Sequence, residues 1–291
     1  MKILFLQTTL SSALICLSGI FPVLFFKKFQ NTKNSKNFSE EQFSNSKILR
    51  HLINFSIGTL LFDALCHVLP EACELISFPV AAFRLVIGII IFFVIEKLSN
   101  LRFPFENTDN NSLRKNQIAA QLNLLANAMD NFCHGLTVGS AFLINSKTGY
   151  FTSFGILLHE IPHEFGDFAL LLRSNKTLFQ CSLYQLTTSF TSFLGGWTAL
   201  FIGEAFKDIA LSWLLPLSAG GFIFIACTSV RGLFESNNLA RKWDKCLLTT
   251  NEAAESVSSI LGVFVMYYAM KFCWFFSLFF LINYRYKNLI S

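Results

Sequence analysis

The residues with the clearest chemistry occupy consecutive positions near the middle of the chain, His159–Asp167, which read H-E-I-P-H-E-F-G-D. They interrupt a long apolar run over residues 148–172. In a helix, His159 and His163 lie one turn apart on one face, and Asp167 extends that face by another turn. Ionisable groups are costly inside a membrane and usually mark ion or substrate paths there. The pattern therefore predicts a metal site within a membrane helix.

Two other interpretations of this stretch must be weighed. A lone buried histidine is more often a hydrogen-bonded core residue than a ligand, but five ionisable groups in one short apolar stretch are too costly for that role alone. The same letters also contain H-E-x-x-H, in which His159 and His163 would bind zinc and Glu160 would be the base of a protease. Pro162 lies between the two histidines, removes one backbone donor and favours a kink. What other helices contribute must decide between a transport path and a protease.

Two further apolar segments carry polar groups at helical spacing. One has three such groups at intervals of four residues, and the other has an Asp–His pair one turn apart with an Asn beside it. These residues are Asp63, His67, Glu71, Asp130, Asn131 and His134. Imidazole and carboxylate ligands together suit zinc, iron(II) or manganese, whereas thiolates would favour copper(I). Ligands repeated about 6 Å apart along a helix axis form successive weak sites, as an ion path requires.

The composition indicates the class of protein that holds these residues. The chain has 53% hydrophobic and 14% charged residues and a mean hydropathy of +0.50, which is typical of a polytopic membrane protein. Its eight cysteines show no paired spacing, which excludes a disulfide framework or a zinc ribbon. We predict an all-α bundle of eight transmembrane helices in one domain over residues 1–291, without a soluble domain. The predicted spans are 3–26, 52–69, 79–95, 118–144, 148–172, 181–206, 209–230 and 257–282.

The basic residues predict how the bundle is oriented. The run over residues 3–26 is longer than the apolar core of a signal peptide, so we expect a retained first span. Sixteen of the 23 lysines and arginines lie in the connections after the first, third, fifth and seventh spans. Only Lys147 and Lys207 lie in the connections after the second, fourth and sixth spans. By the positive-inside rule, both termini are extracytoplasmic or lumenal.

These motifs resemble those of the ZIP (Zrt/Irt-like) metal transporters, in particular the LIV-1 branch. The letters D-N-F-C-H-G at 130–135 are similar to the fourth-span signature, and residues 159–167 are similar to the fifth-span signature. Residues 63–71 and 217–222 resemble motifs of the second and seventh spans. The resemblance implies a transporter and not an enzyme, with eight spans and a metal centre between spans four and five. The ligands that it implies are Asp130, Asn131, His134, His159, Glu160 and His163, with Asp63, His67, Glu71, Glu164 and Asp167 along the pathway.

Several details refine this resemblance. Most of the branch reads His-Asn-Phe-x-Asp-Gly in the fourth span, whereas His and Asp are exchanged here, as in the subgroup of the thirteenth mammalian member. That subgroup is placed in Golgi, endoplasmic reticulum or vesicle membranes, with the plasma membrane as the alternative. The sixth span has Ser189 and Ser192 where some relatives have an acid. The resemblance implies zinc moved into the cytosol, with iron(II) as the alternative, no permanent cofactor, a lipid bilayer, a homodimer and no nucleic acid.

Overall fold

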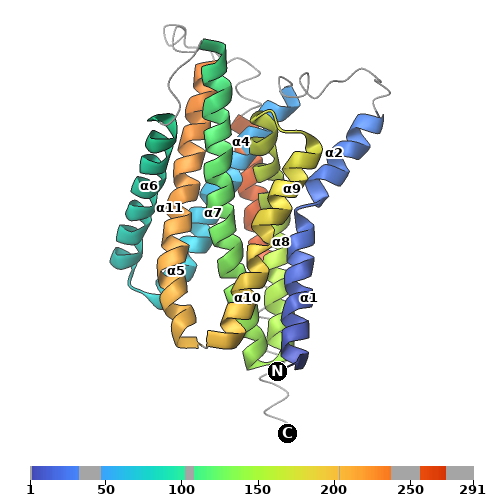
Figure 1. The fold of residues 1–291 in the computed structure, drawn as a ribbon, viewed down its shortest axis with the longest axis vertical. Coiled ribbons are helices and arrows are strands. Elements are labelled where there is room, and N and C mark those ends of the chain that lie inside the picture. Colours follow the sequence, from blue (N-terminus) through green and yellow to red (C-terminus); the bar gives the residue numbers. More distant parts are fainter. Residues whose placement is uncertain (1, 33–46, 102–107, 203, 237–255, 273–291) are drawn as a thin grey trace.

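The computed structural model describes residues 2–32, 47–101, 108–202, 204–236 and 256–272 (Figure 1). Throughout these residues the structure is helical, with no strand, which confirms the all-α prediction. Four helical segments are long and apolar enough to cross a membrane. They are Lys2–Lys27, Ile48–Leu75, Phe78–Leu101 and Phe206–Arg231, and a shorter apolar helix covers Ser256–Phe272.

The helices run side by side along the long axis of the molecule (Figure 1). Their bounds are α1 Lys2–Ser18, α2 Phe21–Thr32, α4 Lys47–Asp63, the π-helix η1 Ala64–Val68, α5 Leu69–Leu75, α6 Phe78–Leu101, α7 Thr108–Ile144, α8 Ser146–Arg173, α9 Leu178–Ser189, α10 Thr191–Ile202 and α11 Glu204–Ser236. The helices α7 and α8 are long, but they are not among the four most apolar segments. Their polar residues lower the hydropathy, because these helices carry the candidate ligands.

Two of the predicted spans consist of two helices each. The span over residues 3–26 comprises α1 and α2, which are separated by Gly19 and Ile20. The span over residues 181–206 comprises α9 and α10, which are separated at Phe190. Around this second break, the hydroxyls of Thr188 and Thr191 donate to carbonyls three residues earlier, at 2.8 and 2.6 Å. Such local bonds compete with the regular helical pattern and bend helices.

The stretch from α4 through η1 to α5 also departs from regular helix. Its five π-helical residues, Ala64–Val68, follow Asp63 directly and include His67. A π-turn inserts extra chain into the helix and re-aims the side chains that follow it, and such turns are frequent at functional sites. The even spacing of Asp63, His67 and Glu71 in the sequence therefore does not keep all three on one regular stripe.

The helices α7 and α8 form a tight antiparallel hairpin around Asn145. The Asn145 side chain caps α8 by accepting a hydrogen bond from the Thr148 amide at 2.9 Å. Since the connection is one residue long, positions equally far from Asn145 on the two helices lie at about the same level. Asn131 and His159 are such a pair. The hairpin thus places the Asp130–His134 stripe beside the His159–Asp167 stretch.

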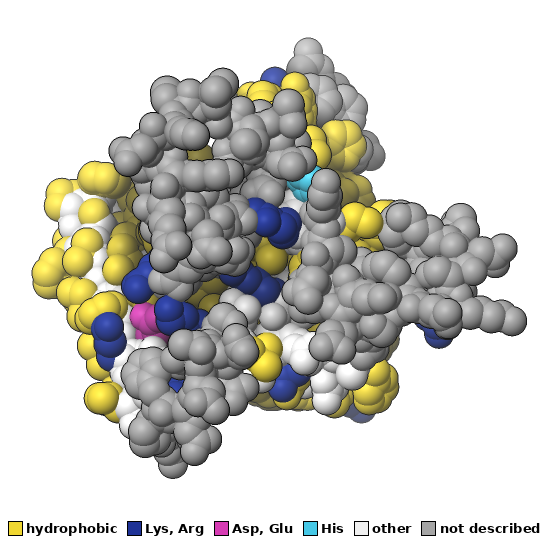
Figure 2. Space-filling model, turned by 90° about the horizontal axis from the view of Figure 1, so that it is seen from above, with side chains coloured by type: hydrophobic (Ala, Val, Ile, Leu, Met, Phe, Trp, Pro, Cys, Tyr) yellow, Lys and Arg dark blue, Asp and Glu magenta, His cyan; other side chains and the backbone are white. Residues whose placement is uncertain are grey.

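Basic side chains gather at one end of the bundle. Figure 2 looks onto the upper end of Figure 1 and shows Lys and Arg side chains on this face, with hydrophobic side chains around it. The start of α4 with Arg50 and the end of α8 with Arg173 both lie toward this end. The opposite end holds the start of α1 and the α7–α8 connection. This is the charge asymmetry on which the predicted orientation depends.

Candidate metal centre

The ionisable side chains singled out in the sequence converge in the interior, between α4–η1, α7 and α8. Asp63, Glu160, Glu164 and Asp167 are fully buried, and the remaining site residues on α7 and α8 are at most 4% exposed. The carboxylates of Asp63, Glu160 and Asp167 have no partner other than the imidazoles of neighbouring histidines. Buried carboxylates without hydrogen-bond donors are costly unless a cation pairs with them. Their number here fits a site made for a metal cation.

A first ligand group joins α7 to α8 through His134, His159 and Glu160. The Nε2 atoms of His134 and His159 lie 3.2 Å apart. Glu160 Oε1 lies 3.0 Å from His134 Nε2 and 3.7 Å from His159 Nε2. Two imidazoles bound to one tetrahedral zinc at its usual bond length place their nitrogens about 3.3 Å apart. The group therefore has the spacing of three ligands around a single small cation.

A second ligand group contains Asp63, His67 and His159. The imidazole rings of His67 and His159 meet edge to face, with centroids 4.6 Å apart. The Nε2 atom of His67 is buried and makes no hydrogen bond. His159 belongs to both groups, so an ion can pass from one group to the other without leaving the same imidazole.

Three more predicted residues flank these groups. Asp130 Oδ2 lies 3.0 Å from His134 Nε2, on the same nitrogen that faces Glu160. His163 Nε2 lies 3.8 Å from Asp63 Oδ2, and its Nδ1 lies 3.4 Å from Asp167 Oδ2. A carboxylate on the far nitrogen of a ligating histidine orients the ring and raises its basicity. Asp167 is placed to do this for His163, and it extends the polar path by one turn of α8.

Other predicted residues turn toward partners of their own. The Asn131 amide nitrogen donates to the side-chain oxygen of Asn127 at 2.6 Å, and Glu71 hydrogen-bonds Thr137. The Asn131 amide nitrogen is thus held by α7 itself, while the Asn131 side-chain oxygen is buried and accepts no hydrogen bond. Asn127 was not singled out in the sequence, although it lies four residues before Asn131 on the same face, which is the spacing that could have found it.

Glu164 has its hydrogen-bond partners on α9. Gln185 donates to its carboxylate at 2.6 Å, and the Ser189 hydroxyl donates to it at 3.1 Å. The Ser192 hydroxyl donates to the Ser189 carbonyl. The two serines that replace an acid in the sixth predicted span therefore stabilise Glu164 or the local helix. Gln185 was also missed, because an isolated glutamine in an apolar helix carries no distinctive spacing.

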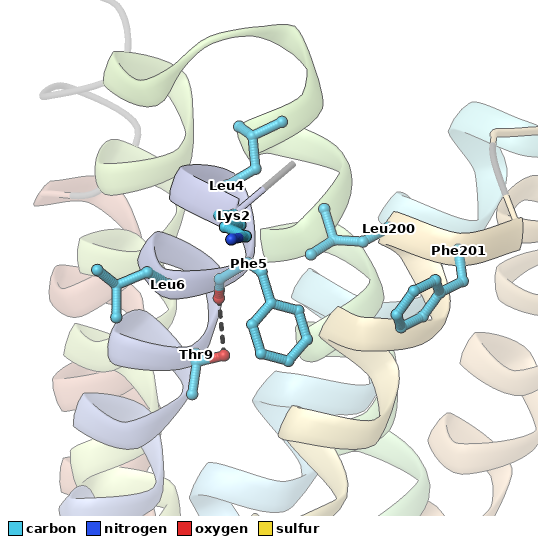
Figure 3. Close-up of a pocket in the computed structure, with 7 residues that line it drawn as sticks. All are labelled: Lys2, Leu4, Phe5, Leu6, Thr9, Leu200 and Phe201. Atoms are coloured by element: carbon cyan, nitrogen blue, oxygen red, sulfur yellow. Dashed lines mark hydrogen bonds between the residues drawn. The ribbon is translucent and has the colours of Figure 1, made fainter.

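The structure also has an apolar hollow, but far from these residues. It lies between the start of α1 and the end of α10 and is lined by seven residues, among them Phe5, Leu200 and Phe201 (Figure 3). The hydroxyl of Thr9, one of the lining residues, is already bonded to the Phe5 carbonyl at 2.7 Å. The hollow has no set of metal ligands and is not part of the path.

Comparison with known proteins decides the family. The family described as ZIP Zinc transporter matches residues 4–115 and 106–270 of the chain. The chain belongs to this family. It is 34% identical over 236 residues to the zinc transporter ZIP13 of Pongo abelii. This alignment covers 76% of this chain and 67% of that protein. It is 33% identical over 270 residues to ZIP13 of Danio rerio, covering 75% of this chain and 76% of that protein. It is also 34% identical over 284 residues to the ZIP13 homolog of Drosophila melanogaster, covering 76% of this chain and 79% of that protein.

Membership of the ZIP family confirms the resemblance drawn from the span motifs. The protein is a multi-pass membrane transporter of divalent metal and not an enzyme. The letters H-E-x-x-H in α8 therefore do not mark a protease. The geometry also fits a transporter. Glu160 lies 3.0 and 3.7 Å from the imidazole nitrogens of His134 and His159, and α4 and η1 supply additional ligands.

Proposed function

We propose that this ZIP family member moves zinc into the cytosol along the polar path between α4–η1, α7 and α8. The observation that carries the proposal is the pair of ligand groups that share His159. Each group offers both imidazole and carboxylate ligands, and together they form a short ladder of neighbouring sites. A conducting path needs such sites, because an ion must leave each one as easily as it enters.

The choice of zinc rests on the ligands and on the relatives. The five members of the two ligand groups offer imidazole nitrogen and carboxylate oxygen, and no cysteine of the described residues joins them. This set accepts zinc and iron(II) and disfavours copper(I). The named relatives are zinc transporters, which favours zinc, and iron(II) is the second candidate.

The test is metal flux in vesicles that contain the purified full chain, with zinc, iron(II) and manganese offered separately. We expect zinc to enter fastest, with competition between zinc and iron(II) because both use the same ligands. Vesicles without protein provide the control. Absence of flux for all three metals would contradict the proposed function, and faster iron(II) flux would make iron(II) the cargo.

Membrane, orientation and assembly form part of the same proposal. By resemblance to the ZIP13 relatives we place the chain in a Golgi, endoplasmic reticulum or vesicle membrane, as a homodimer with both termini lumenal. Zinc would then leave at the basic end of the bundle, which Figure 2 shows. Separate tests of these points are localisation of a tagged chain and its mass in detergent solution.

The orientation makes a prediction about glycosylation. Asn110 and Asn175 head Asn-x-Ser/Thr sequons, as does Asn37, which lies outside the described residues. Asn110 lies near the start of α7, and Asn175 lies two residues after the end of α8. Both belong to the basic end, which we place in the cytosol, so we expect no glycan on any of the three. The mobility of the protein on a gel should not change on glycosidase treatment, whereas a sequon engineered into the α7–α8 connection should be glycosylated. A glycan on Asn110 or Asn175 would reverse the orientation.

A further inference from the structure

The buried polar groups continue past the histidines, from Asp167 onward, into a region that neither ligand group uses. Four side chains from four helices have polar atoms that are buried and make no hydrogen bond. They are Ser56 of α4, Asn123 of α7, Asp167 of α8 and Ser229 of α11, and we call them the inner oxygen row. The first three are fully buried, and Ser229 is 3% exposed. Unpaired buried polar groups in native proteins are uncommon and call for an explanation, such as a bound ion or water.

The hairpin of α7 and α8 places two members of the row at one level. Asn123 and Asp167 are each 22 residues from Asn145, one on each of the two antiparallel helices. Asp167 lies one turn beyond His163, which is about 6 Å along the axis. It is 3.4 Å from His163 Nδ1, while its other carboxylate oxygen makes no hydrogen bond. Asp167 therefore connects the imidazoles to the row.

Contacts with α8 place the other two members toward the same end. A Cβ added at Gly166 would lie 2.9 Å from Ser56 Oγ, so this hydroxyl faces α8 one residue before Asp167. The ring of Phe222 lies against His163, with centroids 5.0 Å apart. Ser229 follows Phe222 by two turns, and α11 runs in the same direction as α8 (Figure 1). Ser229 thus lies beyond His163, on the side of the basic end.

The chemistry of the row differs from that of the histidine groups. It offers a carboxylate, an amide oxygen and two hydroxyls, but no imidazole and no thiolate. Oxygen ligands of this kind suit hard, hydrated cations such as manganese(II). The free amide nitrogen of Asn123 can turn toward a water molecule of the ion or toward a neighbouring oxygen.

We propose that the inner oxygen row is a separate binding site for a divalent cation that retains part of its water shell. On the proposed function, on which this role rests, the ion reaches the row from His163 and continues toward the basic end. Weak oxygen ligands serve this role well, since an ion that has left the imidazoles must not be held tightly again. The row would also favour some ions over others. Ions that readily bind water and oxygen ligands would pass through it more readily.

The test uses manganese(II) bound to the purified full chain and electron spin echo spectroscopy, which detects imidazole nitrogen coupled to the metal. We expect two classes of bound manganese in the wild type, one coupled to nitrogen and one not. Asn123→Leu should weaken the uncoupled class about tenfold, the scale of effect seen when a group that supports a metal site is lost. It should leave the nitrogen-coupled class unchanged, and Ser229→Ala should act in the same direction.

Two controls make the result decisive. Asn100→Leu makes the same exchange at a half-buried asparagine of α6, whose side chain is bonded to the Glu96 carbonyl, and it should change neither class. His159→Ala should weaken the nitrogen-coupled class and leave the other unchanged. If the wild type lacks an uncoupled class, or Asn123→Leu leaves that class intact, the row holds only water and the inference is wrong. A failure of zinc flux with both classes present would instead contradict the proposed function and leave the binding site standing.

Discussion

His159→Ala should abolish metal flux, with a loss of about 100-fold or more. Removing a group that merely supports a metal site already costs about 10- to 100-fold. His159 is proposed as a ligand itself, and it is the one member common to both ligand groups. Its Nε2 lies 3.2 Å from that of His134, and its ring lies against that of His67. The substitution therefore breaks the first group, the second group and the passage between them. Zinc flux into vesicles at equal protein content measures the effect.

A matched control comes from the same residue type. His51 lies on α4, is half-buried and meets the Ser258 hydroxyl at 2.9 Å, away from the ligand groups. His51→Ala should keep most of the flux. Helical content and the elution volume in detergent should be the same for both variants, which separates a lost ligand from a lost fold. Flux near the wild-type rate in a folded His159→Ala protein would show that the ion takes another route.

Gly135→Ala should unfold or strongly destabilise the bundle by separating α7 from α10. These helices form the most extensive helix–helix contact in the described residues. A Cβ at Gly135 would collide with the Ser192 carbonyl oxygen and lie 2.8 Å from the Gly196 amide nitrogen. Since the obstacle is backbone, no side-chain rotation relieves it, and small residues are what allow membrane helices such close approach. We expect a loss of at least about 2 kcal/mol, the middle of the range for overpacked cores. Thermal unfolding in detergent would measure it as a lower midpoint.

The control for Gly135→Ala is a substitution that adds more volume at a less tightly packed position. Ala119 is half-buried on the same helix α7, and Ala119→Val adds two methyl groups where Gly135→Ala adds one. We expect only a small change in the midpoint for Ala119→Val. Because Gly135 follows His134 directly, Gly135→Ala should also lower zinc flux in whatever fraction remains folded. Equal midpoints for Gly135→Ala and the wild type would refute the close contact of α7 with α10.

The sequence by itself determined the class of protein and most of the candidate ligands. Apolar runs of membrane length can bury themselves only as helices, because backbone groups must be paired within the segment. Charge inside such a run is costly, so the few ionisable residues in it stand out. His159 and His163 of α8 could be recognised for this reason, as could Asp130 and His134 of α7. Their spacing of four residues also places each pair on one face of a helix.

Only the tertiary structure decided which of these residues meet. Spacing along one helix contains no information about its neighbours, so Asn131 and His134 looked equally suited to bind metal. The structure bonds the Asn131 amide nitrogen to Asn127 and leaves its oxygen free, and it brings His134 to His159 and Glu160. Likewise, the spacing of Glu164 did not show that α9 supplies Gln185 and Ser189 as its partners.

The same holds for the backbone irregularities and for the region beyond the histidines. The π-helix over Ala64–Val68 brings Asp63 and His67 to His159, although regular spacing alone had marked them as path residues. Breaks at Gly19–Ile20 and Phe190 divide runs that look continuous in hydropathy. Asn123, Ser56 and Ser229 are ordinary small polar residues in the sequence. They stand out because their polar atoms are buried without a hydrogen-bond partner. That burial depends on how four helices pack, which the sequence of a single helix does not show.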